Sequence, residues 1–125
     1  MAGRVTGIGG VFFRARDPEA LARWYQTHLG IPIGTETAED PEWQAEAGPM
    51  VFAPFDGTDG PYPKNRDFLI TLRVEGLDAL IARLEAAGIL PSRHETQNGV
   101  GRFVWIHDPE GNPIELWEPK GPAQS

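Results

Sequence analysis

A single carboxylate set among aromatic residues is the feature of this sequence that could do chemistry. Glu115 lies in the segment Asp108–Pro119, between Ile114 and Leu116. Because side chains of a strand alternate between two faces, Glu115 is expected on the face opposite to these two apolar neighbours. An unpaired buried carboxylate is costly and tends to take up a proton. Glu115 therefore needs a partner, such as a metal ion or an arginine.

Two arginines are candidate partners, because they occupy equivalent positions of an internal repeat. With an offset of 59 residues, Phe12 corresponds to Thr71 and Arg14 to Arg73. One or both guanidinium groups could pair with Glu115 and close the site. Alternatively, one guanidinium could stay free and bind a carboxylate, a phenolate or another anion of a small ligand, because arginine is a planar bidentate donor.

A tight turn ahead of Glu115 should decide which residues share its face. The sequence Asp-Pro-Glu-Gly at 108–111 is typical of a type I turn followed by a left-handed residue. A three-residue loop would pair residue 105 with residue 115 and place Phe103, Trp105 and His107 beside the carboxylate. A four-residue loop would reverse the faces. We favour the three-residue loop.

The elements that position these residues occur twice along the chain. Asp17 and Pro18 are typical of a helix start, and Gly30 is typical of a helix end. The first half is expected to contain this helix and strands over 5–16, 31–39, 43–47 and 50–55. The second half is expected to contain a helix over 77–87 and strands over 68–75, 89–95, 101–107 and 113–118.

The repeated order of one strand, one helix and three strands predicts an α+β fold. Two half-sheets that each bury one face under a helix would gain by joining edge to edge. The predicted architecture is two tandem βαβββ modules in one curved eight-stranded mixed sheet, with helices outside and a cleft inside. A single domain over 1–125 would contain the modules 5–56 and 68–119, the loop 57–67 and the tail 120–125. The loop is rich in Gly, Pro and Asp, and we leave open whether it is a plain linker or a lid.

Composition excludes several classes of protein. A chain of 125 residues, 40% hydrophobic and 23% charged, fits one globular domain. The net charge of -7 and the scattered Lys and Arg residues argue against nucleic-acid binding. No apolar run approaches the roughly 20 residues of a membrane span, and the N-terminus lacks the apolar region of a signal peptide, so we expect a cytoplasmic protein. The absence of cysteine excludes disulfides and thiolate chemistry.

These features together resemble the vicinal oxygen chelate superfamily of glyoxalases, bleomycin-resistance proteins and extradiol dioxygenases. The resemblance covers about Val5 to Pro119 and rests on the duplicated unit and on four segments. These segments are Val11–Asp17, Trp24-Tyr25 with Leu29-Gly30, Leu77–Leu80 and Asp108–Leu116. The resemblance implies paired modules, a cleft, frequent homodimers and, in the enzymes, a divalent metal held by His and Glu of the first and last strands.

Carried over residue by residue, that metal site is largely missing. The four ligand positions fall on Gly10, Val51, Leu69 and Glu115. Only Glu115 offers a ligating group, whereas a catalytic metal needs about three protein ligands. We therefore predict no metal and no other cofactor; a divalent metal completed by other residues, such as Asp56, is the alternative. The three histidines, His28, His94 and His107, are expected in structural or exposed positions.

The function expected from these residues is binding of a flat or anionic organic molecule in the cleft, without a complete metal site. The expected ligand-binding residues are Phe12, Arg14, Phe55, Thr71, Arg73, Trp105 and Glu115. One alternative is a metal-dependent lyase, isomerase or dioxygenase, and another is a structural dimer with a vestigial cleft. The expected partners are a small molecule and a second copy of the chain, joined edge to edge or by exchanged modules.

Overall fold

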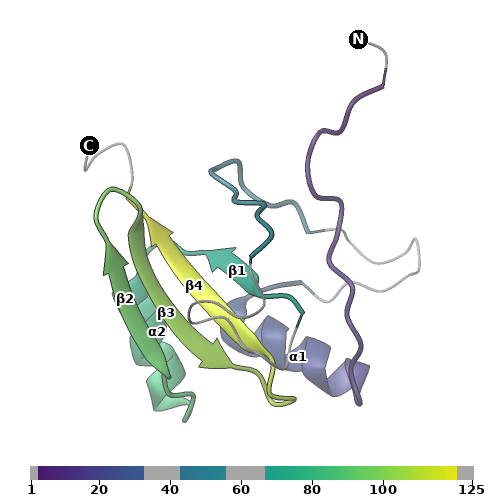
Figure 1. Cartoon of the computed structure of the whole chain (residues 1–125). Helices are drawn as coiled ribbons and strands as arrows, with labels where there is room; N and C mark the ends of the chain where they lie inside the picture. The colour runs from purple at the N-terminus through teal and green to yellow at the C-terminus, as the bar shows by residue number, and fades with distance from the viewer. Residues whose placement is uncertain (1–2, 33–42, 56–66, 121–125) are drawn as a thin grey trace.

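The computed structural model describes residues 3–32, 43–55 and 67–120, and these residues form two helices and one open mixed sheet. The elements are α1 (Pro18–Leu29), β1 (Ile70–Arg73), α2 (Leu77–Ala86), β2 (Arg93–Gln97), β3 (Gly101–His107) and β4 (Pro113–Pro119). The strand order is β1-β4-β3-β2, in which β1 runs parallel to β4 and the other neighbours are antiparallel. Both helices lie behind the sheet in the view of Figure 1.

The helix α1 begins and ends as its sequence predicts. The Asp17 side chain accepts a hydrogen bond from the Ala20 N–H at 3.1 Å, and Pro18 occupies the first turn. Gly30 ends the helix in the left-handed conformation, with φ 68°. Tyr25 is buried in the core, as expected from the apolar spacing of the helix.

The core lies between the helices and one face of the sheet. Alternate residues of β3 and β4 point toward the helices and are almost completely buried: Val104, Ile106, Ile114 and Leu116. They pack against the buried helix residues Leu21, Tyr25, Leu77, Ile81 and Leu84. The period of two in the sequence therefore assigns the two faces of the C-terminal hairpin correctly.

The loop between β3 and β4 has three residues, as favoured. The Asp108 N–H donates to the Asn112 carbonyl at 3.0 Å, and the Gly111 N–H donates to the Asp108 carbonyl at 2.9 Å. Gly111 adopts φ 83°, which a residue with a Cβ rarely tolerates. Trp105 consequently lies opposite Glu115, and the alternative four-residue loop is wrong.

The second-half elements appear in the predicted order with shifted ends. The strand expected over 68–75 is limited to Ile70–Arg73, and the strand expected over 89–95 is found at Arg93–Gln97. Pro91 explains the second shift, because a proline has no N–H to donate to a strand ladder. The first hydrogen bond to β3 on this side comes from the Ser92 N–H to the Trp105 carbonyl, at 2.8 Å.

The described residues of the first half form no strand, which differs from the prediction for 5–16, 43–47 and 50–55. Most of the strand predicted over 31–39 lies outside the described residues. Residues 5–15 run as an extended segment away from the sheet (Figure 1), without a backbone hydrogen bond to another described residue. A strand needs a neighbour to pair with, and the alternating sequence does not supply one. The structure therefore describes one four-stranded sheet, not a sheet of eight strands.

Candidate functional site

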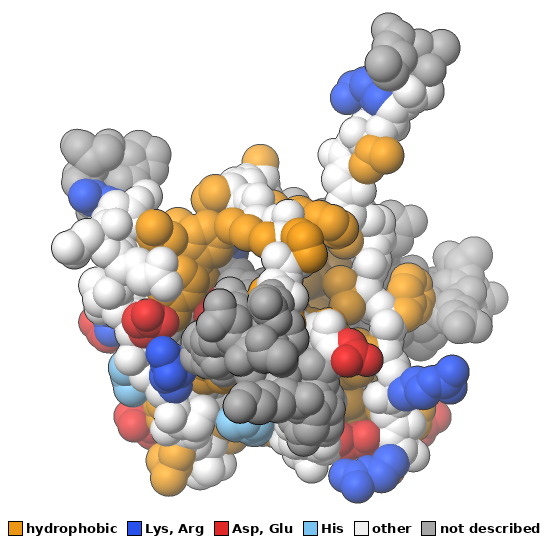
Figure 2. Space-filling view, viewed as in Figure 1, with side chains coloured by type: hydrophobic (Ala, Val, Ile, Leu, Met, Phe, Trp, Pro, Cys, Tyr) orange, Lys and Arg blue, Asp and Glu red, His pale blue; other side chains and the backbone are white. Residues whose placement is uncertain are grey.

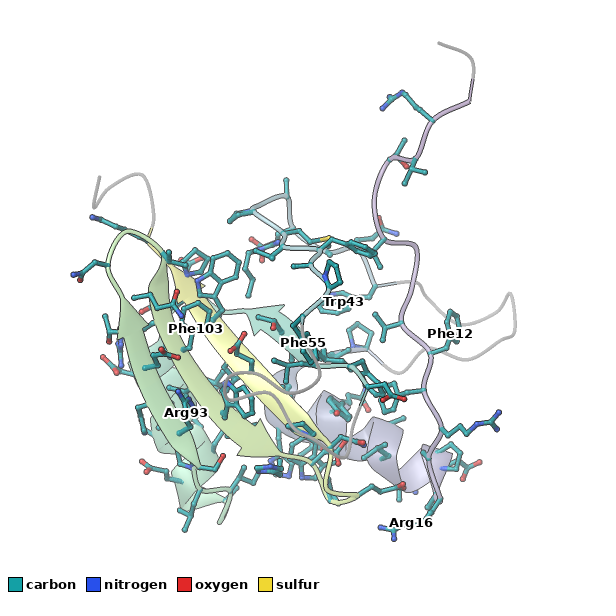
Figure 3. All side chains as sticks on the ribbon, viewed as in Figure 1. Phe12, Arg16, Trp43, Phe55, Arg93 and Phe103 are labelled. Atoms are coloured by element: carbon teal, nitrogen blue, oxygen red, sulfur yellow. The ribbon has the colours of Figure 1, made fainter. Side chains whose placement is uncertain are left out.

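The sheet face away from the helices carries two rows of side chains that cross all four strands. The first row, in strand order β2, β3, β4 and β1, is Arg93, Trp105, Glu115 and Thr71. The second row, in the same order, is Glu95, Phe103, Trp117 and Arg73. Figure 3 shows Arg93 and Phe103 on the side of the sheet that faces the viewer, opposite the helices. We refer to these eight residues as the open face.

Glu115 is held at the centre of the first row by two uncharged donors. The Thr71 hydroxyl donates to Oε1 at 2.8 Å, and the Trp105 indole N–H donates to Oε2 at 2.9 Å. Thr71 is exposed and Glu115 is half-buried. Among the residues that the structure describes, no Lys or Arg forms an ion pair with Glu115, so of the two alternatives left open by the sequence, the pairing of Arg14 or Arg73 with Glu115 is not found.

Arg73 lies on the open face, but its guanidinium donates hydrogen bonds to backbone carbonyls of the first half. It donates to the Pro49 carbonyl at 2.7 Å and to the Glu46 carbonyl. Gly48 permits this approach, since a Cβ at that position would come within 2.8 Å of the Arg73 Nε atom. Arg73 therefore ties residues 46–49 to β1.

Two aromatic residues of the open face were missed in the sequence-based list of site residues. The rings of Phe103 and Trp117 are stacked, with centroids 5.9 Å apart and planes 3° apart. Trp105 and Trp117 are only 7% and 8% exposed, so they form the floor of the face, while Phe103 is half-buried. The signal was present in the sequence, because Phe103 stands two residues before Trp105 and Trp117 two residues after Glu115.

Phe12 and Arg14 lie in different surroundings from Arg73 and Glu115. They line an open concavity of about 550 Å³ beside the extended segment, together with Phe13, Arg16, Asp67, Phe68, Glu110 and Asn112. In Figure 3, Phe12 is well separated from Phe103 on the sheet. The structure therefore groups Thr71, Trp105 and Glu115 by direct contact, and places Phe12 and Arg14 in a second location. Phe55, the last described residue before the gap at 56–66, is half-buried.

The turn between β3 and β4 fixes the start of α1. The Glu110 carboxylate accepts hydrogen bonds from the backbone N–H groups of Arg16 at 2.7 Å and Asp17 at 2.9 Å. The Tyr25 hydroxyl donates to the buried Asp108 carboxylate at 2.8 Å. Burial, and then the hydrogen bond to Asp108, raise the pKa of the Tyr25 hydroxyl well above its usual value.

The end of β4 fixes the start of α2 in the same manner. Glu118 Oε2 accepts hydrogen bonds from the N–H groups of Gly76 and Leu77, both at 3.0 Å. Gly76 precedes the helix without a side chain that could cap it. Together, Glu110 and Glu118 connect the C-terminal hairpin to the start of both helices.

The described residues do not fit a divalent metal. Of the four positions expected to hold a metal, only Glu115 carries a ligating group, because the equivalent positions are Gly10, Val51 and Leu69. Within 3–32, 43–55 and 67–120, no three His, Asp or Glu side chains come together as metal ligands would. Asp56 lies outside these residues. In the same ranges, no helix is long and apolar enough to cross a membrane.

Comparison with known proteins identifies the fold. A structure from Sphaerobacter thermophilus, a member of the glyoxalase/bleomycin resistance protein/dioxygenase superfamily, is 19% identical with a TM-score of 0.61, over 91% of this chain and 98% of that chain. TnmS3, an antibiotic binding protein from a Streptomyces species, is 21% identical with a TM-score of 0.58, over 95% of this chain and 98% of that chain. At these identities the two structures establish the fold alone.

A further comparison covers a smaller part of the chain. A glyoxalase family protein from Enterococcus faecalis is 26% identical, but the alignment spans 47% of this chain and 48% of that chain, with a TM-score of 0.40. The chain thus spans about half the length of this relative, and no argument rests on it. No similar protein was found among curated proteins.

The family assignment rests on the sequence itself. The family model of the glyoxalase-like domain matches residues 10–117, which is most of the chain. The match includes the extended segment from Gly10, both helices and the C-terminal hairpin. It confirms the resemblance on which the sequence interpretation rests. This chain belongs to the glyoxalase-like domain family of the vicinal oxygen chelate superfamily.

Proposed function

We propose that the protein binds a small, flat organic molecule on the open face and does so without a metal ion. The observation that carries this proposal is the placement of Glu115, a half-buried carboxylate held by Thr71 and Trp105 next to the stacked rings of Phe103 and Trp117. Binding sites for small organic molecules combine aromatic walls with a few fixed polar groups. The similarity in fold to an antibiotic binding protein supports a binding role.

An anionic ligand would use the second location. Arg14 is exposed beside the concavity that Phe12, Phe13 and Phe68 also line. A guanidinium next to aromatic rings suits a flat carboxylate or phenolate. In this form of the proposal, Phe12 and Arg14 supply the contacts, and Glu115 is not involved.

The proposal includes a homodimer. In this dimer, the modules 5–56 and 68–119 of one chain pair with those of a second copy and so complete the sheet. Several large apolar residues of the first half are exposed, including Val5 at 91% and Phe12 at 86%. Residues 43–55 add Trp43, Met50, Val51 and Phe52. Figure 2 shows hydrophobic side chains gathered along the top of the molecule. Exposed apolar strand-like segments and free sheet edges favour pairing with another copy.

The binding proposal is tested by fluorescence titration of the tryptophans with 2-naphthol, a flat neutral probe, in the presence and absence of EDTA. We expect saturable binding that EDTA does not change. Phe103→Ala should weaken the binding, because it removes the half-buried ring of the open face. Val100→Ala, which shortens an exposed apolar side chain outside the two rows, is the matched control. Absence of saturable binding, or binding that disappears with EDTA, would contradict the proposal.

The second candidate function is a metal-dependent lyase, isomerase or dioxygenase. Two observations favour it. One is the family match, and the other is Glu115, the one expected metal-ligand position that carries a ligating group. The other ligands would have to come from outside the described residues, for example from Asp56. Element analysis of the purified protein and of Glu115→Ala separates the two functions. A stoichiometric metal that the variant loses would support the enzyme alternative and exclude the metal-free binder.

A further inference from the structure

We propose that Glu115 makes the open face selective for flat ligands that present a paired N–H donor edge, such as an amidine, a guanidine or a protonated amino-heterocycle. This inference rests on the proposed binding function of the open face. It goes beyond that function by naming the polar group that the ligand must carry. It also reverses the sign of the ligand charge expected from the two arginines.

The hydrogen bonds of Glu115 use only part of its capacity to accept hydrogen bonds. Its two oxygens have about four acceptor positions in total. Thr71 and Trp105 occupy one position on each oxygen. Among the described residues, no other donor occupies the second acceptor position of each oxygen. A carboxylate with two parallel acceptors fits two parallel N–H donors. Because Thr71 and Trp105 donate to different oxygens, they also fix the orientation of the carboxylate plane.

The charges on the open face favour a cation over an anion at this position. Neither Thr71 nor Trp105 is charged, so their hydrogen bonds leave the negative charge of the carboxylate in place. The two cations of the face are engaged elsewhere. Arg73 donates to backbone carbonyls of residues 46–49, and Arg93 lies 3.7 Å from the Glu95 carboxylate. A ligand carboxylate placed against Glu115 would meet a like charge that neither Thr71 nor Trp105 neutralises.

The aromatic residues supply the surface for the flat part of the ligand. Phe103 is the diagonal cross-strand neighbour of Glu115, a relation that places side chains roughly 7–8 Å apart. It is half-buried, whereas Trp117, directly opposite it on β4, is almost fully buried and stacked on it. A ring lying against Phe103 can thus direct its donor edge to Glu115. A cationic ring also gains from contact with aromatic faces.

Three probes with the same ring test the inference: naphthalene-2-carboxamidine, naphthalene-2-carboxamide and 2-naphthoate. The amidine is a cation with two parallel N–H donors, the amide is neutral, and the naphthoate is an anion. Tryptophan fluorescence titrations of the native chain give the three dissociation constants. We expect the amidine to bind at least about tenfold more tightly than the amide, as charge-assisted hydrogen bonds do. At the open face, where Phe103→Ala weakens binding, the naphthoate should bind more weakly than the amide.

Two variants separate a specific contact from the overall negative charge of the protein. Glu115→Gln keeps the shape of the side chain, removes its charge and replaces one acceptor with a donor. It should weaken amidine binding at least about tenfold and change amide binding less than about threefold. Glu85→Gln removes the same charge from an exposed position of the helix α2, outside the open face. It should change amidine binding less than about twofold.

The outcomes distinguish this inference from the proposed function. Naphthoate binding that is as tight as amidine binding and is weakened by Phe103→Ala, or equal losses of amidine binding in Glu115→Gln and Glu85→Gln, would overturn the donor-edge inference and leave the flat-ligand proposal standing. Failure of all three probes to bind would overturn both. The comparison of probes on the native chain does not depend on the folding of any variant.

Discussion

At the scale of single residues, the buried contact between Tyr25 and Asp108 predicts a pH effect on stability. The pKa of the Tyr25 hydroxyl is raised in the folded protein by burial and by the hydrogen bond to Asp108. The stabilisation is therefore fully present below the unfolded pKa of about 10 and is lost as the pH rises above it. Tyr25→Phe should lower the free energy of unfolding by about 1–2 kcal/mol at pH 7. Urea unfolding at several pH values between 7 and 11 measures the effect.

The comparison with the variant is its own control. Above about pH 10, the native chain should lose stability faster than Tyr25→Phe, so the difference between them should shrink. Parallel stability curves over this range would show that the Tyr25 hydroxyl does not titrate differently in the folded and unfolded chains.

Single residues also show how far the sequence predicts the site. The alternation of apolar and polar residues correctly placed Glu115 and Trp105 on one face. It did not identify Thr71 as the hydrogen-bond donor to the carboxylate. That contact depends on the parallel register between β1 and β4, two strands that are 44 residues apart at this pair. Reasoning from charge favoured arginine, whereas two neutral donors satisfy the carboxylate.

At the scale of elements, the two helices depend on glutamates that come from elsewhere in the chain. Glu118 accepts hydrogen bonds from the first N–H groups of α2, and no local side chain replaces it. Glu118→Ala should therefore lower the free energy of unfolding by about 1–2 kcal/mol, as the loss of a helix cap does. Thermal or urea unfolding measures the change. Glu85→Ala, an exposed position near the end of the same helix, is the matched control and should change stability by less than about 0.5 kcal/mol.

The elements that the sequence predicts well are those with local signals. Asp17, Pro18 and Gly30 define α1 within one turn at each end. The cap of α2 could not be predicted in this way, because Glu118 is 41 residues away from Leu77. The same holds for strands. Residues 101–107 carry their hairpin partner next to them in sequence, whereas residues 5–16 have none among the described residues.

At the scale of the whole molecule, the exposed first-half segments predict a dimer in solution. Size-exclusion chromatography with light scattering should give twice the monomer mass. Phe12→Asp places a charge in the extended segment and should shift the protein toward the monomer, because Phe12 is 86% exposed in the single chain. Leu90→Asp changes another exposed apolar residue, outside the first half, and should leave the dimer intact. A native chain that stays monomeric at high micromolar concentration would contradict the dimer.

The family and the α+β class predicted from the sequence are confirmed. The predicted sheet of eight strands is not confirmed, because the described residues form a sheet of four strands. The internal repeat indicates which segments are suited to form strands. It does not say which edge they pair with, because pairing between segments far apart in sequence depends on the assembly of the molecule and not on local pattern.

The first row of the open face has a thermodynamic consequence. Arg93, Trp105, Glu115 and Thr71 come from four strands, so they meet only when the sheet is assembled. A compound that binds to this row therefore binds to the native state and not to the denatured chain. By mass action, naphthalene-2-carboxamidine at about 100 times its dissociation constant should add about 2.7 kcal/mol to the free energy of unfolding. Scanning calorimetry would then record a melting temperature that rises with the concentration of the compound. Binding of the compound would therefore show whether the four strands of the open face are assembled.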